Sequence, residues 1–364
     1  MINRELIRIK VVQLTYAYYQ NGEKSMENAE KELLFSLSKS YYLYNYLLLL
    51  IVAVSREERH RVDIAIQRAE REGLARPSEK FVNNRFALQL EENKMLNEFF
   101  ANDNQAWEEH LDYVRRLCNH IEESETYINY MADPTDSYSA DREVWRKLYK
   151  QLIVKDEEID AILEEKSIYW NDDKDIVDTF VLKTINQFSQ ENGADQELLP
   201  EFKDEDEKLF ARKLFRAAIL NAENYHRYMS ETSRNWDFKR LAYMDVVIMQ
   251  IAIAEMMSFP TIPVSVTINE YVDLAKIYST PKSGAYINGM LDSIARYLVK
   301  SGKMQKVMKD EVKKDVVKKN FVKKDTVKKD VVKNDEEKND DVKNEEVKND
   351  EVKNDEVKND VSNQ

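Results

Sequence analysis

The chain has 364 residues, of which 43% are hydrophobic, while glycine and proline occur only six times each. This composition excludes a glycine-rich or strand-dominated protein and favours helices almost throughout. The formal net charge of −13 excludes binding of nucleic acid over the general surface, because phosphate affinity comes from Lys and Arg. An RNA site would therefore be a local basic patch, or would be completed by a basic partner.

The first predicted helix runs from Arg4 to about Gln20, with Asn3 as its N-cap and Asn21-Gly22 as its stop. The charges at its start leave no apolar core for a signal peptide. Three cations, Arg4, Arg8 and Lys10, lie away from the predicted apolar stripe, which consists of Ile7, Val11, Leu14 and Tyr18.

A long helix is predicted next, from about Ser25 to Gly73, with a solvated second half from residue 55 to 72. Its apolar run, Tyr41 to Val54, is shorter than the roughly 20 residues that cross a bilayer, so we expect a buried helix and no membrane. Further helices are predicted across 84–101, 106–131, 140–153 and 156–167.

Residues 148–182 are echoed at an offset of 66. Leu148-Tyr149, Glu157, Trp170 and Val181-Leu182 correspond to Leu214-Phe215, Glu223, Trp236 and Val247-Ile248. Both copies predict a helix, a short helix, a tryptophan and another helix. Duplication explains the echo, and so does the helical period that any two helices share.

Three amphipathic helices are predicted between Trp236 and Leu298, separated at Ser258-Phe259-Pro260 and at Thr280-Pro281. Gly289 lies inside the third helix, where a glycine costs about 1 kcal/mol relative to alanine. We therefore expect a close helix–helix crossing there.

Valine recurs every five residues from Val307 to Val332 and again from Val342 to Val357. Five residues advance a helix by about 500°, so the valines gather on no single face. The net charge is +4 over 307–332 and −6 over 333–364, which leaves −11 on the preceding residues. We predict a disordered, low-complexity tail over 303–364.

No catalytic constellation is visible in the sequence. The four histidines have no metal-ligand spacing, and Cys118 has no second cysteine, which favours a reducing cytoplasm. Phosphate-binding glycine motifs and a serine nucleophile elbow are absent. We predict no enzyme activity, no metal and no cofactor.

Three segments resemble the C-terminal half of the NusB transcription antitermination factors. They are Trp236, Arg240, Asp245, Ile248 and Glu255 at their spacings; the run from Pro263 to Lys276, which includes Ile268-Asn269-Glu270; and Tyr286-Ile287-Asn288-Gly289-Met290-Leu291-Asp292. The first predicted helix also resembles that family's arginine-rich start followed by a V-Q-x-x-Y segment, here Val12 to Tyr16.

The resemblance implies an all-α, non-enzymatic, cytoplasmic protein that binds boxA-like single-stranded RNA together with a NusE-like small ribosomal protein and the RNA polymerase elongation complex. It implies RNA contacts for Arg4, Arg8, Lys10, Lys282 and Ser283, and partner contacts for Tyr16 and Glu255. Ala285 stands where the family usually has a basic residue. Tyr16 as a packing residue and Glu255 as a surface charge remain the alternatives.

The predicted fold is a NusB-like bundle of two helical subdomains, with residues 1–55 and 139–302 forming the NusB-like part, 56–138 an inserted helical segment, and 303–364 the tail. The inserted segment either packs as extra helices or forms a partner surface. One alternative function is a helical protein-interaction scaffold that binds no RNA, favoured by the acidic body and by Glu5 and Ile7 interrupting the basic helix. Another is an RNA-modifying enzyme, for which the strands and glycines of a cofactor domain are missing.

Overall fold

The structure is a computed structural model, and it describes residues 1–22, 25–101, 106–233 and 241–304. All of these residues belong to one compact unit of the chain, Met1–Val307. Over the described ranges the secondary structure is helical, and extended backbone pairs only at an isolated bridge between Ile2 and Phe202. The all-α prediction is confirmed. The predicted tail falls, from residue 305 onward, outside the described residues.

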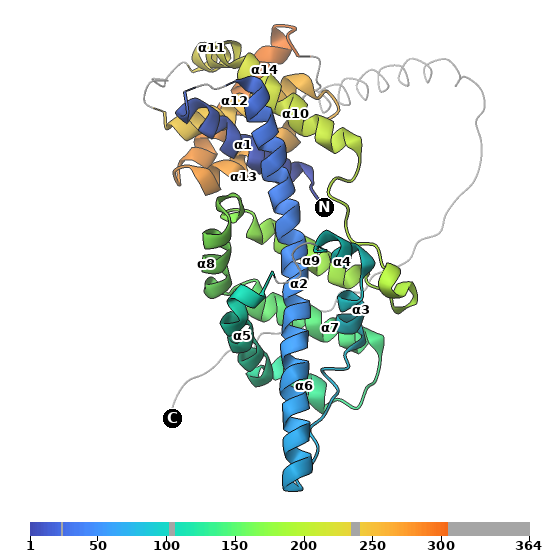
Figure 1. Ribbon diagram of the computed structural model, residues 1–364. Coiled ribbons are helices and arrows are strands. Elements are labelled where there is room, and N and C mark those ends of the chain that lie inside the picture. Colours follow the sequence, from blue (N-terminus) through green and yellow to red (C-terminus); the bar gives the residue numbers. More distant parts are fainter. Residues whose placement is uncertain (23–24, 102–105, 234–240, 305–364) are drawn as a thin grey trace, which may run out of the picture. The chain divides into compact units, whose positions relative to one another are not determined.

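The helices follow one another along the chain as drawn in Figure 1. The first half contains α1 (Arg4–Gln20), α2 (Met26–Glu72), α3 (Arg85–Glu91), α4 (Lys94–Phe99), η1 (Glu108–His110), α5 (Leu111–Glu123), α6 (Glu125–Ala132), α7 (Tyr138–Leu148), η2 (Tyr149–Ile153) and α8 (Glu157–Lys166). The second half contains η3 (Ile168–Trp170), α9 (Lys174–Gln187), η4 (Gln190–Asp195), α10 (Glu205–Leu220), α11 (Ala222–Thr232), α12 (Tyr243–Ser258), α13 (Val264–Tyr278) and α14 (Ser283–Lys300).

Local capping residues set the start of α1 and the end of α2, and both lie close to the predicted positions. The Asn3 side chain accepts a hydrogen bond from the Leu6 N–H at the start of α1. Gly73 ends α2 with a φ of 65°, a left-handed conformation that glycine adopts without steric cost. In contrast, the ranges 84–101 and 106–131 are each divided, because the side chains of Asn93 and Ser124 cap new helices.

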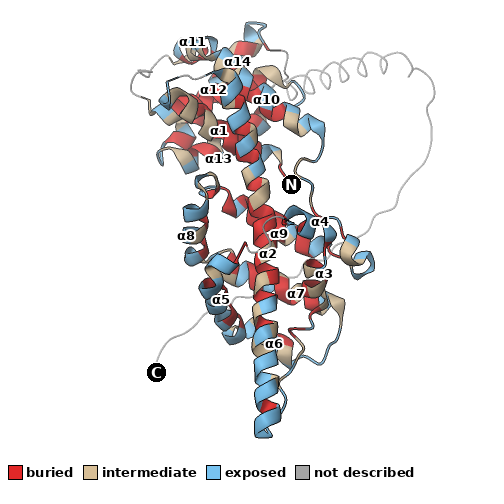
Figure 2. Ribbon diagram, in the orientation of Figure 1, coloured by how far each residue is buried: buried red, intermediate tan, exposed pale blue. Residues whose placement is uncertain are grey.

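The long helix α2 packs against α1 and α10 and also against α3, α5 and α9. Its apolar run is buried, as predicted, while its C-terminal end is largely exposed (Figure 2). By length and composition alone α2 could cross a membrane. Its apolar 18-residue window has a mean hydropathy of 1.3, and 67% of that window is buried inside the structure. α2 also continues through residue 55, where the inserted segment was predicted to begin.

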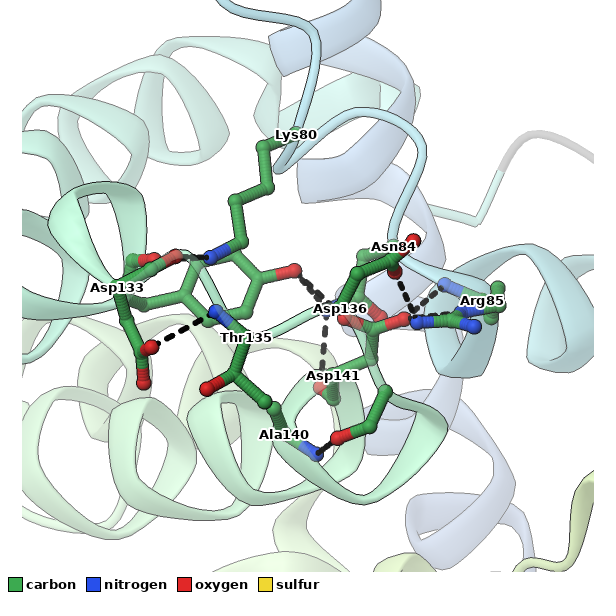
Figure 3. Close-up of polar contacts among 10 residues, drawn as sticks. Lys80, Asn84, Arg85, Asp133, Thr135, Asp136, Ala140 and Asp141 are labelled. Atoms are coloured by element: carbon green, nitrogen blue, oxygen red, sulfur yellow. Dashed lines mark hydrogen bonds and ion pairs between the residues drawn. The ribbon is translucent and has the colours of Figure 1, made fainter.

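Asp141 of α7 joins two helices of the 56–138 segment, α3 and α6, to α7. Asp141 on α7 accepts hydrogen bonds from the Arg85 guanidinium (2.8 Å) and the Tyr130 hydroxyl (2.7 Å), and its backbone carbonyl accepts from Asn84 (2.9 Å). Figure 3 shows Asn84 and Arg85 beside Asp141, and the Lys80 ammonium beside the end of α6 at Asp133. The segment is therefore packed onto the following helices through a satisfied polar network.

The helices after residue 138 repeat at the offset of 66. When 66 is added to their residue numbers, α7 with η2 corresponds to α10, α8 to α11 and α9 to α12, with bounds that agree to within a few residues. The corresponding residues Leu148 and Leu214, and Tyr149 and Phe215, are all buried. The predicted order of helices is confirmed, while Trp236 lies outside the described residues. Duplication stays a prediction.

The three predicted helices are present as α12, α13 and α14, and they pack against one another. The amphipathic prediction is wrong for α12, because every residue from Asp245 to Met256 is buried. The expectation of a close crossing at Gly289 is wrong, because that residue is exposed and a Cβ there would meet nothing within 4 Å. The close approach is instead at Gly284, where a Cβ would lie 3.3 Å from Lys276 Cγ. The glycine that a close contact requires is thus at the start of α14.

The Glu58 carboxyl provides a test of burial in α2. Burial raises its pKa to about 7, against the attraction of Arg61. The ordinary pKa of a glutamate side chain, which applies in the unfolded chain, is 4.5. The folded protein therefore binds this proton more tightly, and the stability that it contributes at low pH is lost as the pH rises from about 4.5 to about 7.

We expect Glu58→Gln to remove this pH dependence. The melting temperature of the variant should fall less than that of the wild type between mildly acidic and mildly alkaline buffers, measured by differential scanning calorimetry. Glu70→Gln, at an exposed position of the same helix, is the control and should follow the wild type. Parallel profiles for wild type and Glu58→Gln would contradict the burial of this charge.

Candidate nucleic-acid interface

Helix α1 carries the three cations that the sequence assigned to RNA, and the structure separates them by burial. The side chain of Arg4 is 43% exposed and forms an ion pair with Glu207. Arg8 and Lys10 are only 4% and 1% exposed. Seven consecutive residues, from Leu6 to Val12, are buried, so α1 is covered on all sides here. Direct RNA contact by Arg8 or Lys10 would require their internal ion pairs to open.

The Arg8 guanidinium is held by two carboxylates. Its Nε and Nη2 donate to the two oxygens of Glu255 at 2.8 and 3.0 Å, and Nη1 donates to Glu270 at 3.0 Å. Burial acts to lower the pKa of Arg8, but the hydrogen bonds and charge of Glu255 outweigh it and the pKa is raised. The planar fork of arginine suits this bidentate pairing. The pair fixes α1 to α12, and the contact with Glu270 fixes it to α13.

Glu255 is fully buried on α12, so its alternative as a surface charge is wrong. Besides Arg8 it accepts hydrogen bonds from the hydroxyls of Thr267 (2.8 Å) and Tyr271 (3.1 Å) on α13. A buried carboxylate with this number of donors is satisfied internally. The partner contact predicted for Glu255 stays a prediction, and its closest contacts are within the protein.

Lys10 joins α1 to a different set of helices. Its ammonium lies 2.8 Å from the Asp173 carboxylate, just before α9, and donates to the Tyr169 carbonyl of η3 at 2.7 Å. Ser40 of α2 donates to the other Asp173 oxygen. Burial lowers the pKa of Lys10 and raises that of Asp173, and in both groups the opposite charge works against the shift. α1 is therefore tied on one side to α12 and α13 and on the other to η3 and α9.

The loop before α14 places its two predicted residues differently. Lys282 is exposed. Ser283 is buried, and its hydroxyl donates to Asp245 at 3.0 Å and contacts the hydroxyl of Thr280 at 2.8 Å. Ser283 thus fastens the start of α14 to the start of α12, and only Lys282 faces solvent. The RNA contacts predicted for both remain predictions.

Tyr16 lies half-buried in the second half of α1. Its ring centroid is 5.7 Å from that of Tyr243, whose side chain is among the exposed large hydrophobic groups. Two aromatic rings are thus side by side at the beginning of α12. This arrangement agrees with packing for Tyr16, and it also leaves an aromatic surface that a partner protein could contact.

α10 carries a group of cations that was not predicted from the sequence. Between Lys208 and Leu220 there are four basic residues and no Asp or Glu, a run that a window count of charge would have found. We call Lys208, Arg212, Lys213 and Arg216 the α10 basic surface. Arg212, Lys213 and Arg216 are exposed, and α10 packs against α1, α2 and α12 (Figure 1).

Another face of the molecule is acidic. A pocket of about 710 Å³ opens between α1, α8, α9 and α13, and its carboxylates include Glu5, Asp160, Glu164, Asp172 and Asp175. Such a lining repels phosphate. Among the described residues no group of three or more His, Cys, Asp or Glu is placed to hold a metal ion.

Comparison with known proteins identifies relatives for part of the chain. A family model described as the NusB family matches residues 176–296. The transcription antitermination protein NusB of Salinibacter ruber is 32% identical over 132 residues, which cover 35% of this chain and 82% of that protein. The NusB protein of Natranaerobius thermophilus is 43% identical over 22% of this chain and 58% of its own length. That of Dictyoglomus turgidum is 40% identical over 24% and 62%.

A solved structure, T. maritima NusB, is 31% identical over 32% of this chain and 82% of that chain, with a TM-score of 0.25. By its fold this is an all-α protein whose first helix is held by internal ion pairs to helices on either side. By its sequence relatives it belongs to the NusB family. This chain is longer than that relative, since 132 matched residues are 35% of this chain but 82% of the Salinibacter ruber protein.

Removing one partner of the Arg8–Glu255 pair should destabilise the fold strongly. We expect Glu255→Ala to lower the free energy of unfolding by about 3–5 kcal/mol, because a buried guanidinium loses its partner. The double variant Arg8→Met/Glu255→Met should recover much of that loss. Both are measured by urea unfolding followed by far-UV circular dichroism.

Lys282→Ala, at an exposed position, is the control and should stay within about 0.5 kcal/mol of the wild type. A Glu255→Ala variant as stable as this control would show that the ion pair does not hold α1 in place.

Proposed function

We propose that the protein is a cytoplasmic transcription antitermination factor that binds boxA-like single-stranded RNA together with a NusE-like small ribosomal protein. It would hold the RNA near the elongating RNA polymerase and would catalyse no reaction. Membership of the NusB family carries this proposal, since the relatives are transcription antitermination proteins. The acidic body makes a basic partner useful, because the partner would offset the net negative charge of −13 that repels phosphate.

Within this proposal the predicted site residues divide into three roles. Arg4 and Lys282 are exposed and would contact phosphates. Arg8, Lys10 and Ser283 are buried and would position α1 and the start of α14. Tyr16, beside Tyr243, would contact the partner protein, and Glu255 would support that surface from inside.

A second candidate function is a helical scaffold that binds protein but no RNA. The burial of Arg8 and Lys10 favours it, because two of the cations assigned to RNA are neutralised by internal carboxylates. The two candidates differ in one observable, which is salt-sensitive binding of single-stranded RNA.

The test is fluorescence anisotropy with a labelled boxA-like RNA and a scrambled RNA, each with and without the NusE-like protein. We expect binding that the partner strengthens and that salt weakens. Arg4→Ala/Lys282→Ala should make the slope of log K against log salt less negative by about 1.4, since each lost contact to a single strand contributes about 0.7.

Arg68→Ala/Lys94→Ala removes one exposed arginine and one exposed lysine from other helices and is the matched control. It should leave the slope unchanged. Absence of RNA binding in every condition, from a folded protein, would favour the scaffold.

A further inference from the structure

We propose that the α10 basic surface is a phosphate-binding site for single-stranded RNA. This inference deepens the proposed function and rests on it, since it names a surface that would carry the RNA. The four cations lie on a stretch without acidic residues, in a chain whose net charge over residues 1–306 is −11. Lys208, Arg212 and Arg216 are spaced by four residues, so they share one face of the helix.

One carboxylate orients two of these cations. Glu30 of α2 is buried and forms ion pairs with both Arg212 and Arg216. The two arginine side chains are nevertheless 46% and 51% exposed. Two guanidinium groups against one carboxylate leave a net positive charge at this place. Glu30 therefore holds the guanidiniums together without neutralising them, which reduces the entropy lost when a phosphate binds.

Three of the four cations, Arg212, Lys213 and Arg216, line a pocket that is open to solvent. Its volume is about 500 Å³, and its lining includes Glu30, Leu209, Arg212, Lys213 and Arg216. Guanidinium groups bind phosphate oxygens through paired N–H donors, and an ammonium adds a point charge. The side chain of Leu209 is 59% exposed and offers an apolar contact to a nucleobase. These groups match the phosphate and the base of a nucleotide.

Ring contacts connect this pocket to α1. The Lys213 ammonium lies 5.1 Å from the ring centroid of Phe259, which is 4.6 Å from that of Phe210. The Arg4 guanidinium lies 5.0 Å from the Phe210 centroid. The α10 basic surface is thus continuous with Arg4, the exposed cation of α1. A strand of RNA that contacts Arg4 would reach Lys213 through adjacent residues.

The experiment compares two triple variants of the full chain that remove the same charge. Arg212→Gln/Lys213→Gln/Arg216→Gln changes α10, and Arg146→Gln/Lys147→Gln/Lys150→Gln changes the positions 66 residues earlier. Each is titrated into the labelled boxA-like RNA with the NusE-like protein. We expect the α10 variant to lose at least about tenfold in affinity and to have a salt slope less negative by about 2. The control should stay within about twofold of the wild type.

A single substitution tests the same surface, and here we expect RNA affinity to rise where the triple variant lowers it. Glu30→Gln keeps both arginines and removes the carboxylate that competes with phosphate. We expect it to bind the RNA more tightly, by about threefold, although the protein becomes less stable. A purely structural role for these ion pairs predicts lower stability and no gain in affinity. Unchanged or weaker RNA binding by Glu30→Gln would therefore overturn the proposal.

The remaining outcomes separate this inference from the proposed function. If the wild type binds RNA and the α10 triple variant binds equally well, the α10 proposal fails and the proposed function survives. Such a result would favour an acidic protein, and not RNA, as the ligand of the α10 basic surface. Equal losses in both triple variants would also overturn it, because only general charge would matter. If the wild type binds no RNA with or without the partner, both proposals fail.

Discussion

The arrangement of this protein depends on two cations buried in its first helix. Arg8 reaches Glu255 on α12, and Lys10 reaches Asp173 before α9, so one short helix binds elements that are otherwise far apart in the chain. The cost of burying these charges is offset only because each has a carboxylate and further hydrogen bonds in place. The position of α1 is consequently fixed in a specific way. Arg4 at its start and Tyr16 in its second half are oriented by this internal pairing.

The same pairing determines which cations of this acidic protein remain available at the surface. Arg8 and Lys10 are neutralised internally, so the cations left for an RNA phosphate on this side are at the start of α1 and on α10. The acidic pocket between α1, α8, α9 and α13 lies elsewhere. Positive and negative faces of this kind orient a polyanion and can also attract a basic partner. In the proposed function both faces have a role.

Much of the fold could be predicted from the sequence because its determinants are local. The Asn3 cap, the Gly73 stop and the prolines between α12 and α13 act on neighbouring residues. The site was harder, because Arg8 and Glu255 are 247 residues apart and nothing local relates them. We predicted a single apolar stripe on α1, which implied that Arg8 lies on an exposed face. The run from Leu6 to Val12 in fact contains only apolar residues besides Arg8 and Lys10, a pattern typical of a helix buried on all sides. The cations of α10 were visible in the sequence, but their convergence on Glu30 was not.

The most direct test of this account is lysine acetylation footprinting by mass spectrometry, with and without single-stranded RNA and the partner protein. Lys10 should be unreactive in both states because it is buried against Asp173. Lys213 and Lys282 should react in the free protein and be protected when RNA is bound. A reactive Lys10 that RNA protects, with Lys213 and Lys282 unchanged, would contradict the account, because RNA would then be reaching α1 through opened ion pairs.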